Sequence, residues 1–143
     1  MPSPADEVDW FGRMYHNVLA GDAVMSVAEV DGHVVGSCEI RRLGVGPKSE
    51  AGHVAVLGIL VDAPHRGKGI GEALMRHALE QCRGRFEIVR LTVFSINERA
   101  QRLYRKLGFV PCGHLPRAVR RGDQYFDEEE MVLQVEPTRS ANR

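Results

Sequence analysis

The chain has 143 residues, and its 19 Lys plus Arg balance its 19 Asp plus Glu, so the formal net charge is zero. A composition of 43% hydrophobic and 27% charged residues is typical of an ordinary globular domain. The balanced charge gives no reason to expect nucleic acid or a membrane as a partner, and no apolar stretch approaches the ~20 residues of a transmembrane helix. We therefore expect one domain over residues 1–143, in the cytoplasm, with a disordered tail over 136–143.

The first half of the chain predicts a helix followed by three antiparallel strands. Apolar residues at three- and four-residue spacing predict an amphipathic helix over residues 6–19. Strands are predicted over 24–30 and 33–40, and the intervening Asp31-Gly32 is typical of a hairpin turn. After a loop, the apolar and β-branched residues 53–61 predict a buried central strand.

The second half predicts two helices and three more strands. A helix is expected over 72–82, a strand over 88–94, and a second helix that begins with either Ser95 or Asn97 as its cap. Two strands follow, from 109 to about 118 and from 124 to 135. Because a helix connects the central strand to the 88–94 strand, these two strands should be parallel. The predicted fold class is α/β (α+β), with a mixed, mostly antiparallel sheet of about six strands and helices on both faces.

The glycine-rich turn at residues 65–71 predicts an anion-binding site. Glycines allow a tight turn, and the N-terminus of the following helix offers unpaired N–H donors and the positive end of its dipole. Arg66 and Lys68 add full positive charge beside these donors. A phosphate or pyrophosphate is the expected anion, and the alternative is a simple connection that carries surface charge.

The spacing of the glycines excludes two common nucleotide loops. A P-loop continues with Gly-Lys-Ser/Thr, whereas Lys68 is followed by Gly69, and no hydroxyl is placed for magnesium. A dinucleotide fingerprint has the spacing Gly-x-Gly-x-x-Gly, which the alternating glycines here do not match. The remaining pattern is Arg-x-x-Gly-x-Gly, formed by Arg66, Gly69 and Gly71.

Together with a second motif, this pattern resembles the GNAT superfamily of acyl-coenzyme-A-dependent N-acetyltransferases. The central motif of that family is an Arg/Gln-x-x-Gly-x-Gly/Ala turn between a strand and a helix. A second family pattern, Asn-x-x-Ala-x-x-x-Tyr-x-x-x-Gly-Phe, is matched downstream by Asn97, Ala100, Tyr104, Gly108 and Phe109. The two motifs occur in the family's order, and the resemblance covers roughly residues 24–135.

The resemblance implies that acetyl-CoA is the co-substrate and that its acetyl group is transferred to a primary amine by direct attack in a ternary complex. The pantetheine arm would lie in a cleft where two parallel strands splay apart, and Tyr104 would be the catalytic acid that protonates the leaving thiolate. An N–H of the central strand would polarise the thioester carbonyl. The implied cofactor-binding residues are Ile59, Leu60, Val61, Arg66, Gly67, Lys68, Gly69, Ile70, Gly71, Asn97, Ala100 and Tyr104. Without the resemblance, Tyr104 reads as a core aromatic residue and Asn97 as a helix cap.

The general base and the acceptor site are less defined. The family often uses a Glu or Asp near the central strand, which contains neither here, and Glu39, Glu50 and His53 are the nearest candidates. His53 and Tyr125 are candidates for substrate binding, and the acidic residues 127–130 either contact a cationic amine or form a half-exposed strand face.

The three cysteines give no metal site and no activated nucleophile. Cys38, Cys82 and Cys112 are far apart, odd in number and without the spacing of metal ligands, so we expect reduced thiols. A covalent route through Cys112 is disfavoured because the spacing implies no His or Lys partner.

The N-terminal part departs from the family pattern. Members usually begin with a strand and a first helix before the helix predicted here over 6–19, and both would be missing. The strand over 24–30 would then have an open edge, which predicts either a homodimer through that edge or another segment in the place of the missing strand.

The sequence is compatible with three functions. The first is an N-acetyltransferase that acts on a small amine, an amino-acid-like molecule or a protein N-terminus. The alternative is a non-catalytic acyl-CoA-binding module with the GNAT fold, acting as a sensor or partner domain. A phosphate-binding protein unrelated to CoA is disfavoured by the glycine spacing.

Overall fold

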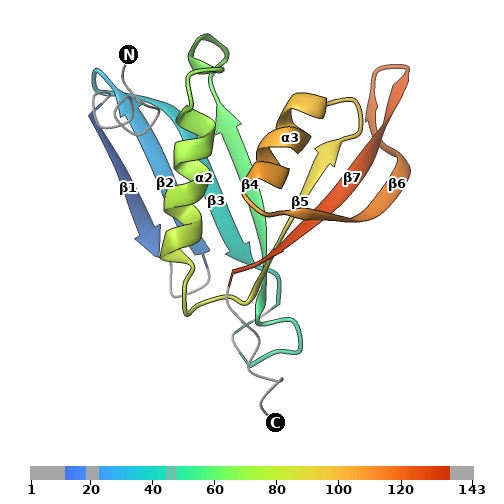
Figure 1. Cartoon of the computed structure of the whole chain (residues 1–143), viewed down its shortest axis with the longest axis horizontal. Coiled ribbons are helices and arrows are strands. Elements are labelled where there is room, and N and C mark those ends of the chain that lie inside the picture. The colour runs from blue at the N-terminus through green and yellow to red at the C-terminus, as the bar shows by residue number, and fades with distance from the viewer. Residues whose placement is uncertain (1–11, 19–22, 45, 47, 136–143) are drawn as a thin grey trace.

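The computed structural model describes residues 12–18, 23–44, 46 and 48–135, which form one seven-stranded mixed sheet and two α-helices (Figure 1). The strand order is β1-β2-β3-β4-β5-β7-β6. The elements are β1 (Gly12–Val18), β2 (Ala23–Val30), β3 (His33–Arg42), β4 (Val54–Val61), the 3₁₀ turn η1 (Ala63–His65), α2 (Ile70–Gln81), β5 (Ile88–Phe94), α3 (Glu98–Lys106), β6 (Val110–Arg121) and β7 (Gln124–Gln134). The mixed, mostly antiparallel sheet is confirmed. The predicted tail over 136–143 lies outside the described residues.

The strand β1 occupies the described half of the predicted N-terminal helix. Its residues pair antiparallel with β2, from Gly12 opposite Val30 to Val18 opposite Val24. The helix prediction is therefore wrong for residues 12–18, while residues 6–11 and 19 lie outside the described ranges. The physical reason is that β2 offers a row of N–H and C=O groups for pairing, an interaction that local apolar spacing does not reveal. Since β2 has this neighbour, its edge is not open, and the alternative that another segment takes the place of the missing strand is confirmed. The homodimer expected through an open edge of β2 therefore loses its basis.

The β2–β3 hairpin and the two helices follow the sequence closely. Asp31 and Gly32 have φ values of 50° and 81°, which is the backbone that a tight hairpin turn requires. Asn97 is the cap of α3, because its side chain accepts a hydrogen bond from the Ala100 N–H at 3.1 Å. The choice left open between Ser95 and Asn97 is thereby decided in favour of Asn97.

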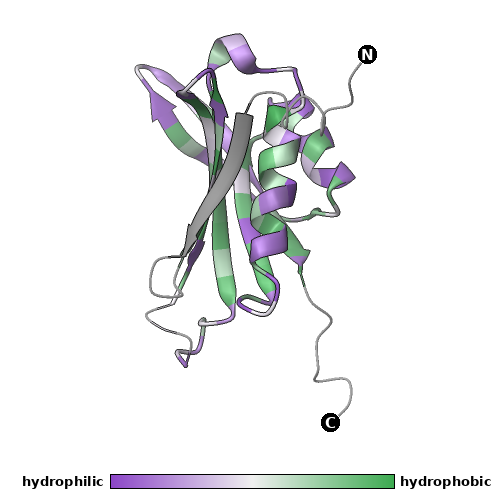
Figure 2. Cartoon of the chain, turned by 90° about the vertical axis from the view of Figure 1, so that its left-hand side faces the viewer, coloured by the Kyte–Doolittle hydropathy of each residue, from purple (hydrophilic) through white to green (hydrophobic). Residues whose placement is uncertain are grey.

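Both described helices lie on the same face of the sheet, so the expectation of helices on both faces is wrong for this part of the chain (Figure 2). Lys106 of α3 donates to Glu72 of α2 at 3.0 Å, which joins the two helices side by side. The reason lies in the connections. The strand β5 is parallel to β4, and β6 is also parallel to β5, because both β5 and β6 run antiparallel to β7. Two right-handed crossovers that move in the same direction across a sheet place their helices on the same face.

The hydrophobic core fills the layer between this face and the helices. From α2 it contains Ile70, Leu74, Met75 and Ala78, which are nearly inaccessible to solvent. From the strands it contains Val24, Ala28, Cys38, Ile40, Ala55, Leu57, Val89, Leu91, Val93 and Met131. The opposite face of β4 is open among the described residues, with Val56 39% and Leu60 65% exposed. Neither described helix has the length and apolar character needed to cross a membrane.

Candidate active site

The strands β4 and β5 separate halfway along their length (Figure 1). Their parallel pairing is limited to Val54, Ala55 and Val56 opposite Ile88, Val89 and Arg90. Beyond this point β4 stays paired with β3, and β5 stays paired with β7 as far as Phe94. The facing backbone edges of residues 57–61 and 91–94 therefore have no strand partner. An extended ligand with amide groups can pair with such edges as an added strand does.

The glycine turn follows directly at the end of β4. Gly67 and Gly69 have φ values of 77° and 86°, a left-handed backbone that residues with a Cβ adopt at a cost. Gly69 is the N-cap of α2, and its carbonyl accepts the first helical bond, from Ala73 N at 3.1 Å. The N–H groups that precede Ala73 in the first turn have no acceptor within the helix.

Two cationic side chains of the turn are exposed. The Nε of Arg66 donates to the Val61 carbonyl at 2.9 Å, which holds the guanidinium at the end of β4. Lys68 makes no hydrogen bond or ion pair with another described residue. Unpaired N–H groups, a helix N-terminus and two cations thus meet at one point, an arrangement that suits a phosphate group. The side chain of Ile70 is buried in the core, so Ile70 can offer only its backbone to a ligand.

Tyr104 lies on the helix-covered face beside the free part of β4. It is 8% exposed and its ring makes an edge contact with Phe109, at 6.2 Å between centroids. Burial raises the pKa of the Tyr104 hydroxyl, and the neighbouring Cys38 thiol adds to this shift. Cys38 is opposite Ile59 in the β3–β4 register, which places Tyr104 near the separating strands.

The hydroxyl of Tyr104 keeps contact with solvent. Within the described part of the chain it makes no hydrogen bond, and the buried side-chain polar atom without a partner there is a different one, Nδ1 of His65. A hydroxyl that is protonated at neutral pH, unpaired and accessible can donate a proton.

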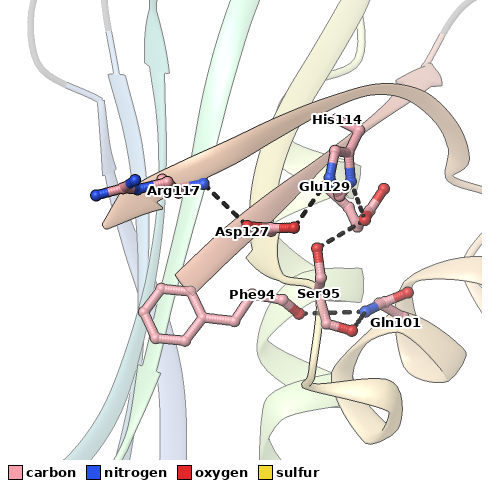
Figure 3. A network of polar contacts seen from close by, with 7 residues as sticks. All are labelled: Phe94, Ser95, Gln101, His114, Arg117, Asp127 and Glu129. Atoms are coloured by element: carbon pink, nitrogen blue, oxygen red, sulfur yellow. Dashed lines mark hydrogen bonds and ion pairs between the residues drawn. The ribbon is translucent and has the colours of Figure 1, made fainter. Parts of the chain in front are cut away.

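A polar network ties the β6–β7 hairpin to the start of α3 (Figure 3). The ring of His114 contacts Glu129 at 2.6 Å through Nδ1 and Asp127 at 3.2 Å through Nε2. Glu129 also accepts a hydrogen bond from the Ser95 hydroxyl at 2.7 Å, and Asp127 accepts one from the backbone N–H of Arg117 at 2.9 Å. These carboxylates are therefore occupied by partners within the chain.

Comparisons with known proteins agree with this geometry. A family model described as the acetyltransferase (GNAT) family matches residues 2–109. The chain belongs to the GNAT acetyltransferase family. The L-amino acid N-acetyltransferase AaaT of Escherichia coli (strain K12) is 37% identical over 108 residues, which are 74% of this chain and 65% of that protein. The N-alpha-acetyltransferase RimI of Mycobacterium tuberculosis is 40% identical over 86 residues, which are 60% of this chain and 51% of that protein.

Solved structures of the GNAT fold resemble the chain as well. The structure of yncA from Salmonella typhimurium with its cofactor acetyl-CoA superimposes with a TM-score of 0.75 at 21% identity, covering 82% of this chain and 67% of that one. The expected co-substrate is thus the molecule bound in a protein of the same fold. The alignments with AaaT and RimI span between about half and two thirds of those proteins.

The two predicted substrate-binding residues of this GNAT chain lie far apart. His53 precedes β4, and its carbonyl accepts hydrogen bonds from Glu87 and Ile88 at the paired end of the strands. Tyr125 lies near the opposite end of β5, where the Arg117 guanidinium stacks on its ring at 4.1 Å. The structure does not bring His53 and Tyr125 into one site, and their roles stay predictions.

The cysteines of this GNAT chain are not activated. Burial raises the pKa of both Cys38 and Cys82 to about 12, and the pKa of Cys112 is raised by desolvation and by Glu130. Thiols with raised pKa values carry little thiolate at neutral pH, which argues against a covalent acyl-cysteine route.

The sequence did not predict the roles of two residues near the GNAT motifs, Gln101 and Arg99. Gln101 is 9% exposed and donates to the carbonyls of Phe94 and Ser95, at 3.2 and 3.0 Å, which fixes the turn between β5 and α3. Arg99 reaches the glycine turn from α3: a Cβ placed on Gly67 would lie 2.8 Å from the Arg99 Nη2. The spacing of apolar residues could have suggested that Gln101 faces inward, but nothing in the sequence placed Arg99 next to Gly67.

Proposed function

We propose that this chain is an N-acetyltransferase that moves an acetyl group from acetyl-CoA to a primary amine. The observation that carries the proposal is the end of β4–β5 pairing at Val56 and Arg90, directly before a cationic glycine turn. The free strand edges suit the amides of a pantetheine arm, and the turn suits a pyrophosphate. Both groups belong to coenzyme A.

Bound acetyl-CoA would supply the acetyl group as a thioester, whose C–S bond breaks when the amine nitrogen attacks the carbonyl carbon. A backbone N–H on the free edge of β4 polarises that carbonyl oxygen. The Tyr104 hydroxyl, which stays protonated at neutral pH since burial raises its pKa further, donates its proton to the departing thiolate and takes up a proton from solvent afterwards. The proton that the attacking nitrogen loses passes to solvent or to a base, and the products are an N-acetylated amine and free CoA.

The acceptor is proposed as an α-amino group. AaaT is named for L-amino acids and RimI for N-alpha acetylation, and these two acceptors share this group. Direct attack in a ternary complex fits the absence of an activated thiol among the described cysteines.

A non-catalytic acyl-CoA-binding module is the second candidate. One observation favours it: β4 carries no Asp or Glu from Val54 to Val61, the strand on which a base is expected. In a pure binding module, the accessible hydroxyl of Tyr104 would have no catalytic role.

Two measurements test the proposal. A thermal-shift assay with acetyl-CoA, CoA, ATP and NAD should show stabilisation by the CoA compounds alone. Release of free thiol from acetyl-CoA should then accelerate with members of a panel of amino acids, polyamines and peptide N-termini.

Tyr104→Phe is the informative variant in the same assays. We expect it to lower the turnover number about 10²-fold or more, as for the loss of a general acid, while the affinity for CoA stays unchanged. If no amine accelerates thiol release, or if Tyr104→Phe turns over like the wild type, the catalytic proposal is wrong and the binding module remains.

A further inference from the structure

The glycine turn receives a cationic group from a helix that is distant in the sequence. Arg99 lies in the first turn of α3, and its Nη2 would be 2.8 Å from a Cβ on Gly67. The guanidinium therefore occupies the space in which a side chain at position 67 would stand. The side chain of Arg99 is exposed and makes no hydrogen bond or ion pair with another described residue.

The packing of α3 explains why Arg99 points to the turn. Lys106 follows Arg99 by seven residues, which is about two helical turns, so both side chains lie on the same face of α3. Lys106 pairs with Glu72 in the first turn of α2, at 3.0 Å. The face of α3 that contacts the start of α2 through Lys106 therefore also contacts the glycine turn before α2, through Arg99. Asn97 caps this end of the helix, which fixes the direction from which Arg99 emerges.

Three cations without an acidic partner among the described residues thus belong to, or lie beside, one short stretch of backbone. Arg66 uses its Nε for the Val61 carbonyl, and Lys68 and Arg99 make no ion pair with a described residue. Like charges gathered in this way repel one another, and an anion between them removes the repulsion. A guanidinium presents a planar set of donors that matches two oxygens of a phosphate group at once.

We propose that Arg99 binds the phosphate groups of coenzyme A from the side of α3 and closes the glycine turn over them. The inference rests on the proposed function, because it assigns a further residue to the same ligand. A methyl group at position 67, besides straining the backbone at its φ of 77°, would make the Arg99 guanidinium shift away from the turn.

Isothermal titration calorimetry on the full chain tests the proposal, with CoA and 3′-dephospho-CoA as titrants. We expect Arg99→Ala to weaken CoA binding about 10- to 100-fold, the usual range for losing a hydrogen bond to a charged group. Arg99→Lys should recover part of this loss, because it keeps the charge but not the planar donor set. An equal loss for both titrants assigns Arg99 to the pyrophosphate, and a loss for CoA alone assigns it to the 3′-phosphate.

Arg105→Ala is the matched control. Arg105 is exposed on a different face of the same helix, and its removal changes the net charge by the same amount. It should bind CoA within about twofold of the wild type, and both alanine variants should unfold at the wild-type temperature without ligand.

The outcomes separate this inference from the proposed function. If the wild type binds CoA and Arg99→Ala binds it equally well, or if Arg105→Ala loses as much as Arg99→Ala, the role of Arg99 is wrong and the proposed function stands. If the wild type binds no CoA compound, both the proposed function and the role of Arg99 are wrong.

Discussion

Gly69 and Gly71 belong to one motif, but the backbone requires a glycine only at the first of these two positions. Gly69 is the N-cap of α2 and has a φ of 86°, which L-residues with a Cβ adopt at a cost. Gly71 lies within the helix, where an added Cβ would meet Ile59 Cδ1 and Val61 Cγ2 at 3.8 Å, an ordinary contact distance. The first glycine shapes the backbone of the turn, whereas the second leaves room for a methyl group.

Alanine substitutions should separate these two roles. We expect Gly69→Ala to lower the free energy of unfolding by about 1–2 kcal/mol, the cost of a left-handed residue with a Cβ. Gly71→Ala should leave it unchanged or raise it by up to about 1 kcal/mol, because alanine is the better helix former. Urea unfolding measures both, and equal losses in the two variants would contradict this assignment.

At the scale of residues, the sequence predicted what depends on neighbouring positions. The spacing of Arg66, Gly69 and Gly71 indicated an anion site, and the turn has the left-handed glycines and unpaired donors that such a site needs. Arg99 was not predicted, because its position beside Gly67 depends on how α3 packs against α2. No local pattern carries information on a packing between segments 32 residues apart (Gly67 to Arg99).

At the scale of elements, the β6–β7 hairpin is held by ionisable side chains. The hydrogen bond with Glu129 is the largest cause that raises the pKa of His114, and the charges of Glu129 and Asp127 add to it. The Ser95 hydroxyl and His114 lower the pKa of Glu129. The network is solvent-exposed, so its contribution is sensitive to salt.

The stability given by this network should depend on pH in a defined direction. A raised histidine pKa stabilises the fold fully below the unfolded value of 6.5, and the effect is lost as pH rises through the folded pKa. A lowered glutamate pKa stabilises above 4.5, and this effect is lost as pH falls through the folded pKa. The largest effect is therefore expected between these two values.

His114→Ala should lower the melting temperature more at pH 5.5 than at pH 9, as measured by circular dichroism. His33→Ala serves as the control, because His33 is an exposed histidine of β3 whose side chain makes no hydrogen bond to a described residue. A penalty for His114→Ala that is the same at both pH values would show that the imidazole acts by packing and not by charge.

The predictions for whole elements succeeded where the pattern was local and failed where a partner was distant. β5 was predicted with its observed bounds, Ile88–Phe94, and α2 and α3 were located by their apolar spacing and caps. β1 was mistaken for a helix because its pairing with β2 was needed to decide between the two. The shared face of the two helices follows from strand order, which periodicity does not contain.

At the scale of the molecule, the separation of β4 and β5 divides the sheet into two parts. The strands β1–β4 and β5–β7 share strand pairing only where the first residues of β4 meet those of β5. A ligand that pairs with both free edges would connect the two parts along the rest of their length.

Hydrogen exchange can detect this connection. We expect CoA to slow amide exchange in residues 57–61 and in the turn at 66–72, because these backbone groups become occupied, while the β2–β3 hairpin stays unchanged. Protection spread evenly over all strands would instead indicate general stabilisation without a ligand between β4 and β5.

The placement of both helices on one face makes the two sides of the sheet unequal. The helix side carries the glycine turn and Arg99, while on the other side Val56, Gly58 and Leu60 are open to solvent in the described part of the chain. For the proposed acetyl transfer, these unequal sides would let acetyl-CoA and the amine approach the point where β4 and β5 separate from opposite directions. We therefore expect a sequential mechanism, with intersecting lines in double-reciprocal plots, and parallel lines would instead indicate a ping-pong exchange.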